Sequence, residues 1–255
     1  MRRLLLGDIH GMKDYLEDVL EQCEFDYEND LLIQIGDIID RGPDPFECVE
    51  ILYKIKNKIL IRGNHDEGFI SKITTGESYI GNHPDNGQGI TLEKFDELSS
   101  LEQDMIGAFF EKQVDYHITD DNILFVHGGI PLNEDIDNVD PHVLHWDREM
   151  LTEALNLLRI GNKPKFTRKY KKIYIGHTPT FYFNIITPMF IGDIINIDTG
   201  SGKGGPLTIM DIDSGQYWQS THTLRYNTNG LDSESEETKT ETGETEYGES
   251  EIQSY

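Results

Sequence analysis

The sequence has few cysteines, and this shortage excludes two kinds of architecture. Cys23 and Cys48 are the only cysteines among 255 residues, and they stand far apart in the chain. Two unclustered cysteines provide neither a disulfide framework nor a cysteine-based zinc site. Such a chain suits a reducing compartment, so we expect a cytoplasmic protein.

Basic residues and long apolar runs are also scarce. The chain has 22 Lys and Arg against 47 Asp and Glu, which gives a formal net charge of -25. This balance repels nucleic-acid phosphates and argues against a nucleic-acid partner. The first apolar run, Leu4–Leu6, ends at Gly7 and is too short for a signal peptide or a membrane span. We therefore expect no membrane partner.

The composition divides the chain into one large domain and an acidic tail. The length allows one large core, and we expect a catalytic domain at 1–228. Within it, 67–112 shows helical patterns around a polar loop, which predicts a helical insertion leaning over the site. Residues 229–255 are rich in Glu, Ser, Thr and Gly, and we expect them to be disordered.

Apolar and amphipathic segments alternate at the start of the chain. Three short apolar runs predict strands, and the segments between them, 12–23 and 43–53, predict helices, the second beginning at Pro43. This alternation indicates an α/β fold with parallel strands. After residue 113 short strands dominate, and turns such as Asp213–Gly215 predict a second, mostly antiparallel sheet packed on the first.

Five apolar runs are each followed by glycine together with Asp, Asn or His; glycine comes first in four of them and follows His127 in the fifth. Open α/β sheets bind ligands at the carboxyl ends of their strands. Five strand ends that deliver such side chains to one place predict a metal site. The five blocks are Gly7–Gly11, Gly36–Gly42, Gly63–Asp66, His127–Gly129 and Gly176–Pro179.

The types of these side chains indicate two metal ions. In extended backbone, residues one position apart point to the same side, so Asp8 and His10 can bind one ion together. A carboxylate such as Asp37 can bridge two cations, whereas a neutral imidazole binds one. An amide oxygen and two further imidazoles would complete the second ion. The predicted ligands are Asp8, His10, Asp37, Asn64, His127 and His177.

The charge of such a centre suits a phosphate substrate. Two dications roughly 3.5–4 Å apart would share a water, lower its pKa, and clamp the attacking and leaving oxygens of an in-line displacement. Arg41 and Arg148 would add positive charge, and guanidinium groups suit phosphate oxygens well. His65 follows Asn64 and can face the leaving group, paired with Asp40. General acids of this kind contribute about 10²- to 10⁴-fold.

Together the blocks resemble the signature of the phosphoprotein phosphatase family of metallophosphoesterases. The resemblance is strongest to the small bacterial and phage serine/threonine protein phosphatases, and it spans the chain to about Gly215. Two further segments, 146–149 and 197–208, resemble a phosphate-binding segment and a C-terminal strand-loop-strand of that family. Asn86 and Gly87 are followed by Gln88 where the family often has another glycine, so the substrate loop departs from the pattern.

The resemblance implies a four-layer α/β/β/α fold, a two-sheet β-sandwich flanked by helices. It also implies a dinuclear centre, usually manganese in bacterial members, with iron or zinc as alternatives. It assigns the six predicted ligands, makes Asp40 and His65 the acid pair, and makes Arg41, Arg148 and Asn64 the substrate contacts. The implied activity is hydrolysis of phosphoserine or phosphothreonine in a protein or peptide, with dual specificity as a variant.

Other functions are possible for the same blocks, some enzymatic and one not. A symmetrical dinucleoside tetraphosphate hydrolase resembles the same blocks and is the nearest rival enzyme. Metal-dependent nucleases and cyclic phosphodiesterases usually show Gly-His-x-His at the last block, whereas His177 is followed by Thr178 and Pro179. A catalytically silent scaffold is the non-enzymatic alternative. The sequence does not indicate an oligomeric state.

Overall fold

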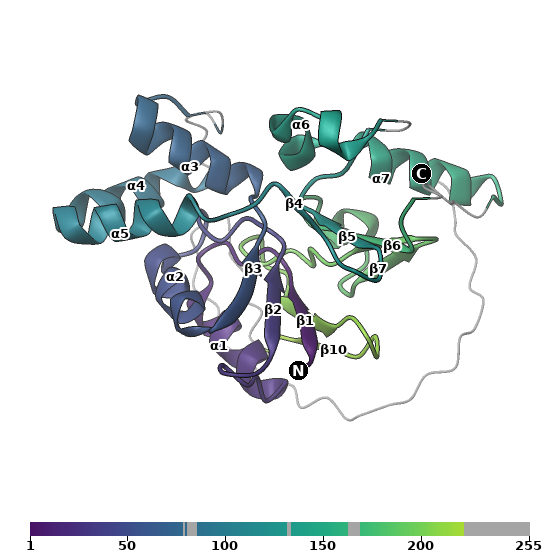
Figure 1. The fold of residues 1–255 in the computed structure, drawn as a ribbon, viewed down its shortest axis with the longest axis horizontal. Helices are drawn as coiled ribbons and strands as arrows, with labels where there is room; N and C mark the ends of the chain where they lie inside the picture. The colour runs from purple at the N-terminus through teal and green to yellow at the C-terminus, as the bar shows by residue number, and fades with distance from the viewer. Residues whose placement is uncertain (79, 81–85, 132–133, 163–168, 222–255) are drawn as a thin grey trace, which may run out of the picture. The chain divides into compact units, whose positions relative to one another are not determined.

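The computed structural model describes residues 1–78, 80, 86–131, 134–162 and 169–221. Within them, ten strands form two five-stranded sheets. Figure 1 shows these sheets side by side with helices on their outer sides. The acidic tail expected at 229–255 lies outside the described residues, so the domain boundary stays a prediction. No helix in the described part of the chain is long and apolar enough to cross a membrane.

The first sheet joins the N-terminal strands to a C-terminal hairpin. Three parallel strands form its centre and one edge, and an antiparallel pair completes it beside β1. Two helices, α1 (Lys13–Gln22) and α2 (Pro45–Lys54), connect the parallel strands. In order across the sheet, the strands are β10 (Tyr217–Gln219), β9 (Thr208–Asp211), β1 (Arg3–Leu6), β2 (Leu31–Gln34) and β3 (Asn57–Leu60).

The second sheet is mixed, so the expectation of a mostly antiparallel sheet was wrong. Its three inner strands run parallel, and only the two edge strands are antiparallel to their neighbours. The hairpin at Asp213–Gly215 joins β9 to β10 and therefore belongs to the first sheet. The order is β4 (Tyr116–Ile118), β5 (Ile123–Val126), β6 (Lys172–Ile175), β8 (Ile194–Asn196) and β7 (Met189–Ile191).

Alternating apolar side chains bind the two sheets together. In β1, Leu4 and Leu6 face the helices α1 and α2, while Leu5 faces the other sheet. On the face of the second sheet that meets the first, the rings of Phe125 in β5 and Tyr174 in β6 stack with centroids 5.2 Å apart. Because both faces of the central strands are buried, their runs are continuously apolar. The strands are thereby fixed in register, which fixes the positions of the polar residues that follow them.

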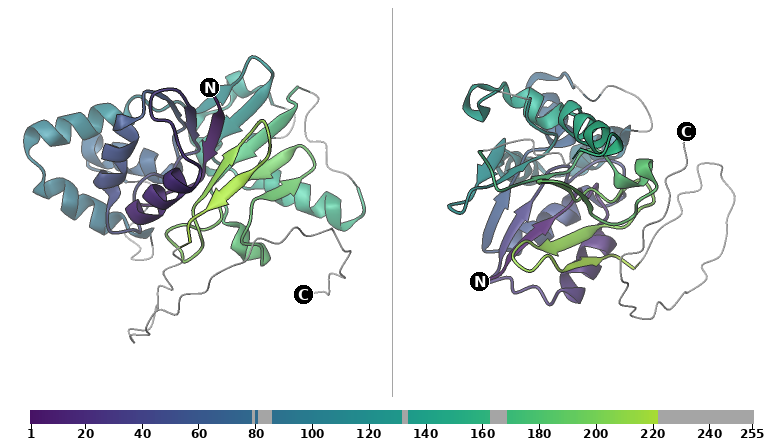
Figure 2. Two further views of the ribbon diagram at one scale, coloured as in Figure 1. Left: turned by 90° about the horizontal axis from the view of Figure 1, so that it is seen from below. Right: turned by 90° about the vertical axis from the view of Figure 1, so that its right-hand side faces the viewer.

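Helices cover both outer faces of the sandwich. α1 and α2 pack on the first sheet, and α6 (Pro141–Trp146) and α7 (Glu149–Arg159) pack on the second. The right-hand view of Figure 2 shows the teal helices α6 and α7 on one side and the purple N-terminal helices on the other. This gives the expected four-layer α/β/β/α arrangement.

The segment 64–110 forms three helices. They are α3 (Asn64–Thr75), α4 (Gln88–Glu97) and α5 (Ser100–Phe110), the last begun by a capping box in which Ser99 and Glu102 exchange hydrogen bonds. Of the polar loop expected at 81–89, residues 81–85 lie outside the described residues, and Gln88 and Gly89 already belong to α4. α3 begins at Asn64 itself, so a helix N-terminus faces the predicted site.

One helix starts later than the sequence indicates. Pro43 was expected to open α2, but the helix begins at Pro45. The backbone N–H groups of Gly42 and Asp44 donate to the carbonyls of His10 and Gly11, at 2.8 and 3.0 Å. These bonds keep 42–44 in the loop beside the first block. These tertiary hydrogen bonds therefore override the helix-starting preference of Pro43. They also hold the first block, Gly7–Gly11, against the second, Gly36–Gly42.

Candidate metal centre

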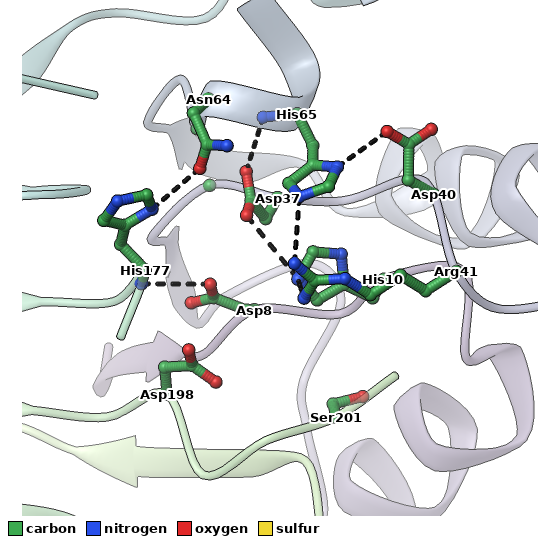
Figure 3. Close-up of polar contacts among 12 residues, drawn as sticks. Asp8, His10, Asp37, Asp40, Arg41, Asn64, His65, His177, Asp198 and Ser201 are labelled. Atoms are coloured by element: carbon green, nitrogen blue, oxygen red, sulfur yellow. Dashed lines mark hydrogen bonds and ion pairs between the residues drawn. The ribbon is translucent and has the colours of Figure 1, made fainter. Parts of the chain in front are cut away.

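The structure brings all five predicted blocks to one end of the sandwich. Asp8 follows β1, Asp37 follows β2 and Asn64 follows β3, while His127 and His177 follow β5 and β6. Figure 3 shows most of these side chains converging from separate elements. Each predicted ligand is at most 5% exposed.

Asp37 lies at the middle of the cluster. Its Oδ2 is 3.5 Å from Nε2 of His10, and its Oδ1 is 3.3 Å from Nε2 of His127. Oδ1 also accepts a hydrogen bond from the backbone N–H of His65 at 3.0 Å. The carboxylate therefore faces an imidazole on each side, which is the arrangement a bridging ligand needs.

Asn64 and Asp8 complete the two sides. Oδ1 of Asn64 is 2.7 Å from Nδ1 of His177 and 3.2 Å from Nε2 of His127. Oδ2 of Asp8 accepts the backbone N–H of His177 at 3.1 Å. Oxygen and imidazole donors are thus mixed on both sides of Asp37, a set that suits first-row divalent metals.

Two buried atoms in this cluster have no protein partner. They are Oδ1 of Asp8 and Nε2 of His177. Buried polar groups without partners are costly, and a bound cation would satisfy both atoms. Three-residue groups with donor atoms within 4.8 Å of one another lie on both sides of Asp37: His10, Asp37 and His65 on one, and Asp37, His127 and His177 on the other. The residues present therefore fit two divalent cations.

Backbone carbonyls orient two of the imidazoles. Nδ1 of His10 lies 3.0 Å from the carbonyl oxygen of Ile39, and Nδ1 of His127 lies 2.9 Å from that of Ile35. Because a carbonyl only accepts, each Nδ1 carries the proton and each Nε2 presents a lone pair toward Asp37. No sequence pattern predicts these two contacts, because every residue has a backbone carbonyl.

Burial sets the protonation of the cluster. Burial lowers the pKa of His10 and of His177 well below the usual histidine range, which keeps both rings neutral. Burial also raises the pKa of Asp8, and the nearby carboxylates of Asp198 and Asp37 add to this rise. Burial likewise raises the pKa of Asp198 to about 6. Neutral imidazoles beside crowded carboxylates form a site that favours added positive charge.

The imidazole of His65 is held in place by Asp40. Nδ1 of His65 and Oδ2 of Asp40 are 2.7 Å apart, and both side chains are almost fully buried. The other Asp40 oxygen accepts a hydrogen bond from the hydroxyl of Thr91 on α4, also at 2.7 Å. Nε2 of His65 faces away from Asp40, toward the guanidinium of Arg41. The helical segment expected to lean over the site thus supports Asp40 through Thr91.

The two arginines approach the cluster from different elements. The guanidinium of Arg41 contacts Nε2 of His10, and its second amino group is 3.0 Å from Nε2 of His65 (Figure 3). Arg148 precedes α7 and donates to the hydroxyl of Thr178 at 3.1 Å and to the carbonyl of His177 at 3.4 Å. Arg41 therefore borders the group of His10, Asp37 and His65. Arg148 borders the other group, at His177.

Several site residues adopt left-handed backbone, which corrects one sequence inference. His10 has φ of 52°, so Asp8 and His10 converge through a turn rather than through extended backbone. Asp37, Asp40 and Arg41 also have positive φ, as does His177. Such conformations cost on the order of 1–3 kcal/mol each and persist where surrounding contacts enforce them. The loops are thus held in shapes that propensity disfavours.

Two glycines permit this close approach. A Cβ atom at Gly63 would overlap the carboxylate of Asp37, and one at Gly176 would overlap that of Asp8. Any larger residue would therefore push a predicted ligand out of place. This explains why glycine recurs in blocks whose chemistry is carried by the neighbouring side chains.

Asp66 anchors the loop that carries Asp37. Its carboxylate accepts backbone N–H groups of Asp37, Ile38 and Gly63, at 3.0 to 3.1 Å, and the amide of Gln113 at 2.8 Å. Its four bonds tie the second and third blocks into one unit.

We expect Asp66→Asn to destabilise the fold by about 1–3 kcal/mol, because an amide nitrogen would face at least one buried N–H donor. Thermal unfolding of the metal-free protein measures this loss. Asp96→Asn, on the exposed face of α4, is the matched control and should leave the unfolding temperature unchanged. Equal stability of the Asp66 variant and the wild type would contradict the anchoring role.

Comparisons with known proteins agree with this geometry. Residues 1–187 match the sequence model of the calcineurin-like phosphoesterase family. A serine/threonine-protein phosphatase 1 from Salmonella typhimurium is 27% identical over 212 residues, covering 82% of this chain and 90% of that protein. An asymmetrical bis(5'-nucleosyl)-tetraphosphatase from Bacillus cereus is 28% identical over 231 residues, covering 82% and 89%.

A solved structure shares the fold. It is a protein serine/threonine phosphatase from Saccharomyces cerevisiae, with a TM-score of 0.55 and 17% identity, covering 86% of this chain and 79% of that one. The family match spans most of the chain and all five strand-end blocks, including the two histidine groups around Asp37. This chain therefore belongs to the calcineurin-like phosphoesterases, and it is a hydrolase of that metallophosphoesterase family.

Proposed function

We propose that the protein removes phosphate from phosphoserine and phosphothreonine in proteins or peptides, with dual specificity as a variant. One observation carries this proposal: the hydrogen-bonded pair of Asp40 and His65 presents Nε2 of His65 next to the guanidinium of Arg41, beside the predicted metal ligands. A phosphoryl group contacted by Arg41 would place its leaving oxygen within reach of His65.

The residues around Asp37 would hold two divalent cations, with manganese as our first choice. Bound there, they would polarise the phosphoryl group and make a water more acidic. Asp8 and His10 would hold one side, and His127 and His177 the other, with Asn64 contributing to the second side and to substrate binding. Asp37 would be shared between the two.

The remaining groups act on the substrate itself. Arg41 and Arg148 would bind phosphoryl oxygens and offset the negative charge of the protein in this one place. Asp40 would hold the imidazole of His65 in one orientation, with Nδ1 toward the carboxylate. His65 would then give the proton at Nε2 to the departing serine or threonine oxygen.

The nucleotide alternative has specific support. The Bacillus cereus relative is named as an asymmetrical tetraphosphatase, whereas the alternative expected from the sequence is a symmetrical one, and it is as similar to this chain as the protein phosphatase from Salmonella typhimurium. A dinucleoside polyphosphate needs the same metal ligands and phosphate contacts. The acid pair of Asp40 and His65 favours the phosphomonoester proposal, because a leaving alkoxide needs a proton more than a leaving phosphate does.

A comparison of specificity constants tests the choice. We expect the manganese-loaded protein to show a kcat/KM at least tenfold higher for phosphoserine and phosphothreonine peptides than for diadenosine tetraphosphate. Removal of metal with a chelator should abolish both activities, and added manganese should restore them. A tenfold preference for the nucleotide would establish the alternative. Inactivity on every substrate with every metal would favour a silent scaffold.

A further inference from the structure

A second polar cluster lies next to the predicted metal centre. The sequence motifs assign no role to most of its residues. Its centre is the half-buried carboxylate of Glu67 on α3. This carboxylate faces Nδ1 of His142 at 3.0 Å through both oxygens, and Oε2 accepts the indole N–H of Trp146 at 2.9 Å. The Glu67 cluster comprises Glu67, Asp115, His142, His145 and Trp146.

His145 lies between two carboxylates in this cluster. Its Nδ1 is 3.4 Å from Oε2 of Glu67, and its Nε2 is 3.0 Å from Oδ1 of Asp115. The ring is 1% exposed, whereas His142 is on the surface. Three side chains of the short helix α6 thus converge on one carboxylate of α3. Coulomb attraction and hydrogen bonding between them fix how these two helices meet.

Both ends of this contact lead into the active site. On α3, Glu67 is two residues beyond His65. On the other side, the ring of Trp146 meets His177 edge-on, with centroids 6.1 Å apart. Two residues after Trp146, Arg148 donates to the carbonyl of His177 and to the hydroxyl of Thr178. A shift of α6 would therefore move Arg148 relative to His65.

We propose that Glu67 is a positioning residue that holds Trp146 and thereby fixes Arg148 against the phosphate-binding side of the site. The inference rests on the proposed role of Arg148 as a phosphate contact. Glu67 touches neither substrate nor metal ligands; it acts through α6. Its removal should weaken phosphate binding more than it slows the chemical step.

The charges around His145 give the cluster a pH dependence. Burial alone would lower the pKa of His145, but its hydrogen bond to Asp115 and the nearby carboxylate of Glu67 raise it above the ordinary value. The other charged groups facing the cluster are His142 and Arg62, the latter lowering the pKa of Asp115. A raised histidine pKa stabilises the folded state at low pH, and this stabilisation is lost as the pH rises through the folded value.

The central test is Glu67→Gln, which keeps the size of the side chain and removes its charge. We expect the KM for p-nitrophenyl phosphate and the inhibition constant of inorganic phosphate to rise roughly tenfold, the effect of losing one hydrogen bond to a charged group. The kcat should change by less than about threefold. Manganese content should stay the same. Glu50→Gln, on the exposed side of α2, is the matched control.

A double-mutant cycle with Arg148→Ala separates the two proposals. If Glu67 acts through Arg148, the phosphate affinity of the double variant should equal that of Arg148→Ala alone, because coupled residues are not additive. Additive losses would overturn the positioning role. If Arg148→Ala leaves phosphate affinity unchanged, the proposed role of Arg148 fails instead. A fall in kcat of Glu67→Gln with unchanged phosphate affinity would also overturn the inference.

Two further measurements guard against simple misfolding. Trp146→Phe keeps an aromatic ring beside His177 but is smaller and lacks the indole N–H, so phosphate affinity should fall in the same direction by a smaller factor. In the wild type, the inhibition constant of phosphate should increase as the pH rises past the pKa of His145. In His145→Gln this increase should be smaller. A rise of equal steepness in His145→Gln would show that another group causes it.

Discussion

Replacement of His65 by asparagine is expected to lower kcat by about 10²- to 10⁴-fold, the usual contribution of a general acid. The physical reason is the position of its Nε2 beside Arg41, with Nδ1 held 2.7 Å from Asp40. Asparagine has no proton donor of suitable acidity at that point. Turnover of p-nitrophenyl phosphate at saturating manganese is the measurement.

Metal content distinguishes this role from a competing one. His65 also belongs to one of the two metal-compatible groups, with His10 and Asp37. If it is the acid, His65→Asn should retain both manganese ions by elemental analysis. If the variant loses an ion, His65 is a ligand and the proposed acid role fails. His117→Asn, on β4 and outside the site, is the control and should keep both metal and activity.

Asp37→Asn is expected to have the largest effect of any single change. Asp37 belongs to both metal-compatible groups, so its loss should remove at least one ion and lower kcat/KM by at least roughly 10³-fold, since metal catalysis contributes several kcal/mol. Asparagine is preferred to alanine here because Asp37 has φ of 57°, which asparagine tolerates well. Elemental analysis and kinetics together measure the outcome.

The unfolding temperature should respond to metal in the wild type but not in Asp37→Asn. Manganese should raise the unfolding temperature of the wild type and have little effect on Asp37→Asn, because ligand binding stabilises only the state that binds it. In chelator, the variant should be only modestly less stable than the wild type: burial disfavours the charge of Asp37, but the imidazoles of His127, His65 and His10 favour it and hold the pKa of Asp37 well below its usual range. Strong destabilisation in chelator would indicate a structural role for Asp37 instead.

The sequence was sufficient to find the site because its chemistry is written locally. Each predicted ligand follows an apolar run within a few residues, and the carboxyl ends of parallel strands meet at one edge of a sheet. Asp37, His127 and His177 therefore came together as the pattern indicated. Their roles stay predictions until metal content and kinetics are measured. Arg148 had weaker support, because its position depends on how α6 and α7 pack.

The sheet arrangement depended on contacts that no local pattern encodes. The hairpin of β9 and β10 has the same short strands and turn whether it joins one sheet or the other. It pairs with β1 through Leu4, Leu5 and Leu6, some two hundred residues earlier in the chain. Pairing between distant segments is decided by which edges remain free and which faces can be buried, so it emerges only when the whole core packs.

The residue sequence by itself determined the identity of the reactive groups, the strand ends that present them and the family to which the chain belongs. Tertiary structure alone decided how they are held. The carbonyls of Ile35 and Ile39 orient two imidazoles, Thr91 supports Asp40, and Glu67 gathers the side chains of α6. These contacts join residues far apart in the chain through atoms that many residue types share, and such contacts exist only after the sandwich has closed.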